Sequence, residues 1–227
     1  MAIYYHGSSV LFKSFDLSHA LEGDGKVKFG YGVYLTSRYE RAAHYAFNKK
    51  RPENKDYYVY TVEGPDKTEY NCLWQSPSCP VSESIVSRVK EKLGEDIPVE
   101  AIAEGKYFRK YVANRLVGVQ ESIKKMFGSA PYIGEIALAN LLDSIGVDMM
   151  AQPFIWKPPF ENIDLAIVNE KKVKILKIEK IELDAKKHLV PGSETLVKLE
   201  QVSIYVYANC FYLGNYVPLH PLKQFDT

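Results

Sequence analysis

Two short stretches decide which fold this sequence can adopt: Ile3-Tyr4-Tyr5-His6-Gly7-Ser8 and Phe29-Gly30-Tyr31-Gly32-Val33-Tyr34-Leu35-Thr36. We expect a β-strand in each of them. The first strand carries a His-Gly pair, and the second is entered through glycines and reaches a tyrosine. Two strands of this kind can clamp a flat, amide-bearing ring, which indicates a nicotinamide site.

The residue types at these positions each have a chemical reason. Gly7 has no Cβ, so its backbone can approach a ligand closely and offer its N–H and C=O to a carboxamide. The neighbouring His6 can hydrogen-bond a ribose hydroxyl through a ring nitrogen, and Tyr34 offers an aromatic face for stacking. Gly30 and Gly32 let the chain turn tightly into the second strand.

A helix is predicted at residues 37–48, directly after the second strand. Thr36 or Ser37 is the expected N-cap, and Glu40 is placed to complete a capping box. Tyr45 lies on this helix and is expected to close the pocket from its other side.

These stretches resemble the ADP-ribosyltransferase superfamily, on the branch with a His-Tyr-acid active site that includes diphtheria toxin and the poly-ADP-ribose polymerases. The matching residues are Tyr5-His6-Gly7-Ser8 for its His-Gly strand, Gly30-Tyr31-Gly32-Val33-Tyr34 for its glycine-flanked tyrosine, and Tyr45 for its second stacking tyrosine. The resemblance implies an α+β fold with a split antiparallel β core and flanking helices. It also implies NAD as substrate, no metal, and six binding residues: His6, Gly7, Ser8, Gly32, Tyr34 and Tyr45.

The third element of this family is an acid at the start of a late apolar strand, and here the acid falls on Asp164. The family usually has Glu, which is one methylene longer. Glu161 substitutes if the preceding loop folds back, and Glu170 if the strand register differs. Such a carboxylate stabilises the oxocarbenium-like ribose that forms as nicotinamide leaves. The resemblance thus implies Asp164 or Glu161 as catalytic acid, acting with His6 and Tyr34.

The acceptor of the ADP-ribose is expected near residues 152–160, a Pro-rich and aromatic stretch just before the acid. Many transferases of this type recognise their target in that loop, so the resemblance implies acceptor contacts at Phe154 and Trp156; ordinary loop packing explains both residues equally well. A protein side chain and a nucleic-acid base are both open as acceptors. Free bacterial or phage domains of this kind often act as toxins, which implies an antitoxin or inhibitor protein as a further partner.

Two other functions stay open from the sequence. An NAD glycohydrolase uses the same pocket with water as the acceptor. A non-catalytic module that binds NAD or ADP-ribose keeps the fold after losing the acid, and the Asp where the family has Glu supports this alternative.

The composition predicts one globular domain. The chain has 227 residues, is 46% hydrophobic and carries a formal net charge of +1, which allows one good core and gives no global attraction to nucleic acid or membranes. No apolar run reaches the length of a membrane span and no basic, apolar leader precedes the first strand, so we expect a cytoplasmic protein. The three cysteines have no zinc-binding spacing, and their small, odd number predicts reduced thiols.

We expect a catalytic core at residues 1–176 and a β-rich extension at residues 177–227 that packs on the same domain. The expected strands lie at 3–6, 32–35, 57–63, 164–168 and 172–181, and the expected helices at 37–48, 82–93, 106–126 and 133–145.

Overall fold

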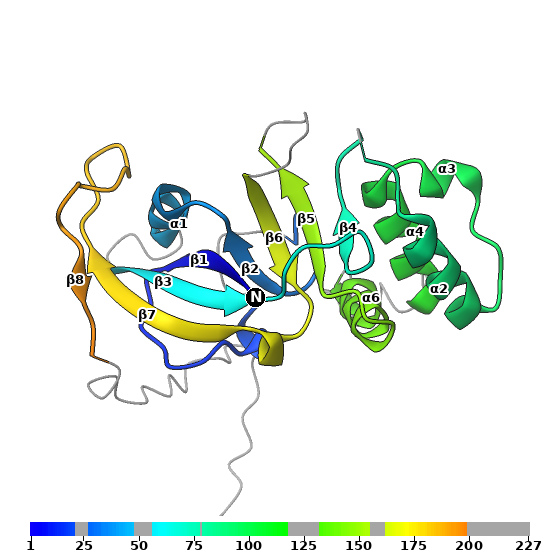
Figure 1. Ribbon diagram of the computed structural model, residues 1–227, viewed down its shortest axis with the longest axis horizontal. Helices are drawn as coiled ribbons and strands as arrows, with labels where there is room; N and C mark the ends of the chain where they lie inside the picture. The colour runs from blue at the N-terminus through cyan, green and yellow to red at the C-terminus, as the bar shows by residue number, and fades with distance from the viewer. Residues whose placement is uncertain (21–26, 48–55, 78, 118–131, 155–161, 199–227) are drawn as a thin grey trace, which may run out of the picture.

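The computed structural model describes residues 1–20, 27–47, 56–77, 79–117, 132–154 and 162–198 (Figure 1). The strands are β1 Ala2–Ser8, β2 Val33–Thr36, β3 Tyr57–Gly64, β4 Cys72–Trp74, β5 Met149–Pro153, β6 Ile163–Ile167, β7 Lys174–Ile181 and β8 Thr195–Leu196. The α-helices are α1 Tyr39–Ala46, α2 Glu83–Leu93, α3 Val99–Ile102, α4 Gly105–Val117 and α6 Ile133–Ser144. Two short 3-10 helices lie at Leu17–His19 and Glu170–Lys172.

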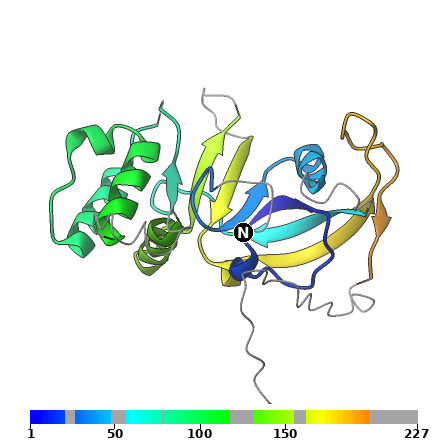
Figure 2. The same cartoon turned by 180° about the vertical axis from the view of Figure 1, so that it is seen from behind.

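One eight-stranded sheet, in the order β4-β5-β6-β2-β1-β3-β7-β8, carries the whole described fold. Every neighbouring pair is antiparallel except β4 with β5, which is parallel. Helix α1 lies over the middle of the sheet, and α2, α3, α4 and α6 gather beside β4 and β5, as Figures 1 and 2 show from opposite sides. The molecule is therefore α+β, as the sequence predicts.

The sheet is nearly divided between β1 and β2. These strands share one register pair among the described residues, Tyr5 with Thr36, whereas β1 and β3 pair continuously from Ala2 to Ser8. Beyond the Tyr5 pair, the imidazole of His6 enters the gap, and its Nδ1 donates a hydrogen bond to the Tyr34 carbonyl oxygen at 2.7 Å. A side chain thus replaces the backbone ladder at this junction.

Burial alternates along the central strands and separates the two faces of the sheet. On β6, Ile163, Leu165 and Ile167 pack into a core with β1, β2 and β3. The opposite face of the sheet is covered by α1 over β1 and β3, and by the helical group over β4 and β5. Asp164 lies between two residues of the first core, so its side chain points to the opposite face, toward α1.

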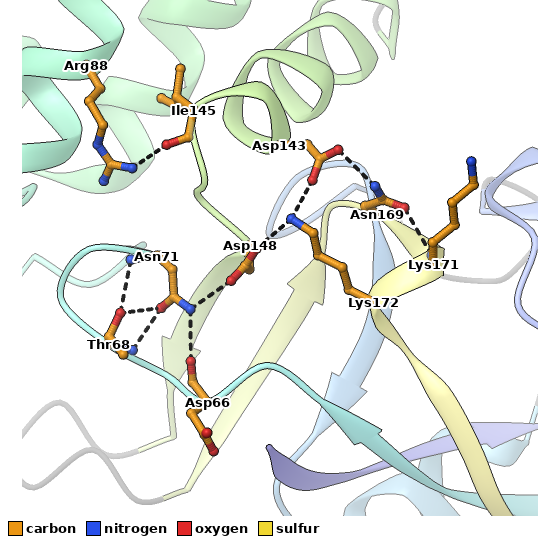
Figure 3. Close-up of polar contacts among 10 residues, drawn as sticks. All are labelled: Asp66, Thr68, Asn71, Arg88, Asp143, Ile145, Asp148, Asn169, Lys171 and Lys172. Atoms are coloured by element: carbon orange, nitrogen blue, oxygen red, sulfur yellow. Dashed lines mark hydrogen bonds and ion pairs between the residues drawn. The ribbon is translucent and has the colours of Figure 1, made fainter.

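A polar network ties the helical group to the sheet, as Figure 3 shows. The ammonium of Lys172 donates to both Asp143, at the end of α6, and Asp148, just before β5, at 2.6 Å each. Asn169 donates to the second oxygen of Asp143, and Asn71, just before β4, donates to the second oxygen of Asp148. The Lys172 hydrogen bond lowers the pKa of Asp143. The network fixes β5, which forms one wall of the candidate site.

The predicted elements are largely observed, but the expected cap of α1 is wrong. Arg38 is the N-cap and makes no side-chain capping bond. The hydroxyl of Ser37 instead accepts a hydrogen bond from the Ile163 N–H, and Thr36 donates to the Ile163 carbonyl. Both side chains hold β6, and the Thr36 hydroxyl also accepts from the N–H of Arg38 at 3.4 Å, one residue before the helix begins.

Strand β7 crosses residue 176, pairs with β3 and carries β8 at its outer edge. Residues 177–198 therefore continue the same sheet, while residues 199–227 of the expected extension lie outside the described residues. None of the helices that the structure describes is both long and apolar enough to cross a membrane.

Candidate functional site

Asp164 is the centre of the site. It is the second residue of β6, and it pairs in register with Thr36 of β2 on one side and Gln152 of β5 on the other. Only 4% of the residue is exposed. A carboxylate this deeply buried needs charged or hydrogen-bonding partners, because desolvation disfavours its ionised form.

Arg41 and Tyr45, one turn apart on α1, supply these partners. The Nε of Arg41 lies 2.9 Å and 3.0 Å from the two carboxylate oxygens of Asp164, and its Nη2 bonds the second oxygen. The Tyr45 hydroxyl donates to the same oxygen at 3.2 Å. Burial, followed by the negative charge of Asp164, raises the pKa of Tyr45, so this phenol keeps its proton and remains a donor.

The guanidinium of Arg41 also contacts two aromatic rings. Its Cζ lies 4.1 Å from the ring centroid of Phe154 and 5.1 Å from that of Tyr45. Both distances fall within the range of cation–π attraction. The two members of the ion pair differ in their contact with water, because 38% of the Arg41 side chain is exposed but only 6% of the Asp164 side chain.

A small pocket opens at this ion pair, with a volume of about 170 Å³. It is lined by Lys28, Arg41, Gln152, Pro153, Phe154 and Asp164. Pockets that hold whole drug-sized ligands usually measure about 300–1,000 Å³. The pocket is thus large enough for one ring-sized group, and the rest of a dinucleotide would extend beyond it.

Tyr34 lies on the same face of the sheet as Asp164. It stands two residues before Thr36 on β2, and alternation along the strand puts both side chains on one face. Its hydroxyl donates to the Gly30 carbonyl and accepts from the Phe29 N–H, both at 3.0 Å. Burial raises its pKa to about 12. The turn before β2 therefore fixes the ring of Tyr34.

His6 lies on the opposite face from Asp164. Its ring packs edge-on against Phe12, Phe15 and Tyr60, with centroid distances of 5.2–5.9 Å. Burial lowers its pKa, which favours the neutral ring. Because Nδ1 donates to the Tyr34 carbonyl, Nε2 is the acceptor nitrogen of the neutral imidazole. The structure thus brings His6 to the backbone of Tyr34 and not to the carboxylate.

The two glycines expected in the site have packing reasons for being glycine. A Cβ on Gly7 would lie 1.8 Å from the Ala42 carbonyl oxygen, because α1 crosses directly over β1. A Cβ on Gly32 would lie 2.5 Å from the Ile167 carbonyl oxygen. The Ser8 hydroxyl accepts from the N–H two residues ahead, in a local turn. These contacts account for the three residues without a ligand.

Of the three candidate acids, the structure describes Asp164 and Glu170. Glu170 lies in the 3-10 helix beyond the far end of β6, away from Asp164. Glu161 and Trp156 lie outside the described residues. Phe154, the other expected acceptor contact, lines the pocket and contacts Arg41.

Sequence reasoning missed Arg41, Gln152 and Lys28. Arg41 stands four residues before Tyr45, a spacing that puts both side chains on one face of a helix, and this spacing could have identified it. Gln152 belongs to β5, a strand that was not expected. Nothing in the local sequence marks Lys28.

The comparisons with known proteins leave the site to be interpreted from its geometry. No model of a known protein family matches the chain, and no curated protein sequence matches it either.

Proposed function

We propose that this protein is an NAD-dependent ADP-ribosyltransferase that moves ADP-ribose from NAD to a macromolecular acceptor and releases nicotinamide. The observation that carries the proposal is the hydrogen bond from Tyr45 to Asp164, two residues far apart in the sequence, on the face of the sheet that the Tyr34 side chain shares. These are the stacking residues and the acid that the His-Tyr-acid branch requires.

The fold supports the same proposal. A split β core needs a junction where two halves of a sheet separate, and β1 and β2 are joined at Tyr5 and Thr36 only, among the described residues. The His-Gly pair and the Tyr34 backbone lie at this junction, linked through the His6 imidazole. We infer an ADP-ribosyltransferase-like core from this arrangement.

The chemistry follows from the charge at Asp164. As the bond between ribose C1′ and the nicotinamide nitrogen breaks, its electron pair leaves with nicotinamide and positive charge develops on the ribose. A carboxylate held beside the ribose stabilises this charge more than it stabilises bound NAD. The acceptor then attacks C1′ and gives up its proton. Tyr45 holds one oxygen of Asp164 during these steps.

A second function is favoured by one observation, the Arg41 ion pair. Arg41 neutralises Asp164 in the structure, as it would in a module that binds NAD or ADP-ribose without cleaving it. A glycohydrolase differs from the transferase only in using water as acceptor.

Labelled NAD separates these functions. The protein is incubated with NAD labelled in the adenylate phosphate and with cell lysate, and the products are digested with protease or nuclease. We expect label on macromolecules, removed by one of the two digestions, and none with Asp164→Asn. Free ADP-ribose alone would identify a glycohydrolase, and intact NAD that binds to the protein would identify a binding module.

A further inference from the structure

The side chain of Arg41 has the physical properties of a ligand in its own site. Its guanidinium is planar and positively charged. It makes two parallel contacts with a buried carboxylate and lies over the rings of Phe154 and Tyr45. Planar organic cations in general bind favourably where a carboxylate lies beside aromatic ring faces.

We propose that Arg41 occupies a slot for a planar aromatic cation, the positively charged pyridinium ring of a nicotinamide nucleotide, and that Arg41 must swing out before this ring can enter. The inference rests on the proposed function for the identity of the ring. It goes beyond that function because it assigns Arg41 as an internal competitor for the substrate.

The exchange is electrically balanced. A pyridinium ring that replaces the guanidinium leaves the charge beside Asp164 unchanged, so the buried carboxylate has a cationic partner both before and after the exchange. A ring that enters while Arg41 remains adds a third positive charge to a pocket that Arg41 and Lys28 already line. Displacement is therefore favoured over simple addition.

Arg41, and not Asp164, is the group able to move. The Arg41 side chain is 38% exposed and can carry its charge into water at small desolvation cost. Asp164 belongs to a central strand that is paired on both sides, and the Tyr45 hydroxyl holds one of its oxygens independently of Arg41. The carboxylate and its aromatic surroundings thus remain in place when Arg41 leaves.

The test uses two ligands of nearly equal shape: 1-methylnicotinamide, a pyridinium cation, and nicotinamide, its neutral counterpart. Their affinities are measured by titration calorimetry for the native protein and for Arg41→Ala. When a side chain of the protein fills the binding site in part of the molecules, a ligand can bind only to the remaining molecules. Its apparent Kd is then the intrinsic Kd divided by the fraction of molecules in which the site is open. We expect Arg41→Ala to bind the cation at least about tenfold more tightly than the native protein, with a smaller gain for the neutral ligand.

Two further variants control for charge and for the loss of an arginine. Arg41→Ala combined with Asp164→Asn should bind both ligands alike, because the carboxylate no longer selects the cation. Arg38→Ala removes an exposed arginine just before α1, which pairs with Glu40, and should change neither affinity. Equal affinity of Arg41→Ala and the native protein for the cation would overturn the proposal.

A measurement on the native protein keeps the proposal testable if Arg41→Ala does not fold. The Nε–H of Arg41 is followed by NMR while 1-methylnicotinamide is added. We expect its signal to shift and to exchange faster with water at saturating ligand, and an unchanged signal would overturn the proposal. NAD that is bound but never cleaved would contradict the proposed enzyme while leaving the cation slot intact, so the two failures are distinguishable.

Discussion

Asp164 and Arg41 form an ion pair whose two members differ in their exposure to water. The Asp164 side chain is 6% exposed, whereas the Arg41 side chain is 38% exposed. The guanidinium also contacts the Phe154 ring and lines the pocket beside the pair. A buried acid whose cationic partner can leave is an acid that a cationic substrate can reach.

At the same scale, the Tyr45 hydroxyl contributes a single hydrogen bond to Asp164. Tyr45→Phe removes this bond and keeps the ring, so nicotinamide release from NAD should fall about three- to tenfold with little change in KM. Tyr39→Phe is the matched control, because Tyr39 also lies on α1 but bonds Glu179. Equal turnover in the native protein and Tyr45→Phe would show that this hydroxyl does not support the acid.

The burial of His6 makes the free energy of unfolding depend on pH. Burial lowers its pKa from the ordinary 6.5, so the unfolded chain binds more protons between the two values. The free energy of unfolding should therefore fall as the pH drops below about 6.5, by up to about 1 kcal/mol. His6→Gln should flatten this decline in urea titrations at pH 7.5 and 5.5.

At the scale of elements, β2 and α1 form one functional unit. Together they carry Tyr34, Arg41 and Tyr45, and α1 is set against β1 by the absence of a side chain at Gly7. The distance from α1 to the sheet therefore decides whether Tyr45 and Arg41 reach Asp164.

Gly7→Ala tests this packing. The added methyl would lie 1.8 Å from the backbone of α1, so the helix must move away. We expect a loss of about 2–3 kcal/mol in the free energy of unfolding. Gly64→Ala, at the other end of the β1–β3 pairing, meets only the ring of Tyr4 at 3.2 Å and should cost much less. Similar losses from both substitutions, measured by urea titration, would contradict the close approach of α1.

The elements were predictable where the sequence pattern is local. The strands and helices around residues 3–6, 32–35, 57–63 and 82–93 follow from their own composition, and all are observed. Strand β5 was missed because Met149–Pro153 is short and contains Gln152 and a proline, and only its pairing with β4 and β6 makes it a strand. The N-cap failed because Ser37 serves β6, a partner distant in sequence.

The site followed the same rule. The family resemblance points to Asp164 and to Tyr45, and in the folded chain a hydrogen bond joins their side chains. From the sequence alone, Arg41 is expected to be an ordinary charged residue on the surface of a helix. Its role depends on β6 and on Phe154, which reach it only in the folded chain.

At the scale of the whole molecule, the helical group and the sheet are joined through Lys172 (Figure 3). Lys172→Met leaves Asp143 and Asp148 without their shared cation, and both carboxylates are partly buried. We expect a loss of about 1–2 kcal/mol in the free energy of unfolding, and a smaller loss in high salt. Lys171→Met is the neighbouring control, because the Lys171 amine points away from the network. Equal stability of both variants would mean that the network carries no net energy.

The central claim, that Asp164 cleaves NAD by stabilising charge, is tested most directly by nicotinamide release from NAD. Asp164→Asn keeps the size of the side chain and removes its charge, while Glu170→Gln does the same at an acid beyond the other end of β6. We predict that turnover falls about a hundredfold or more in Asp164→Asn and stays native-like in Glu170→Gln. Native-like release from Asp164→Asn would contradict the account.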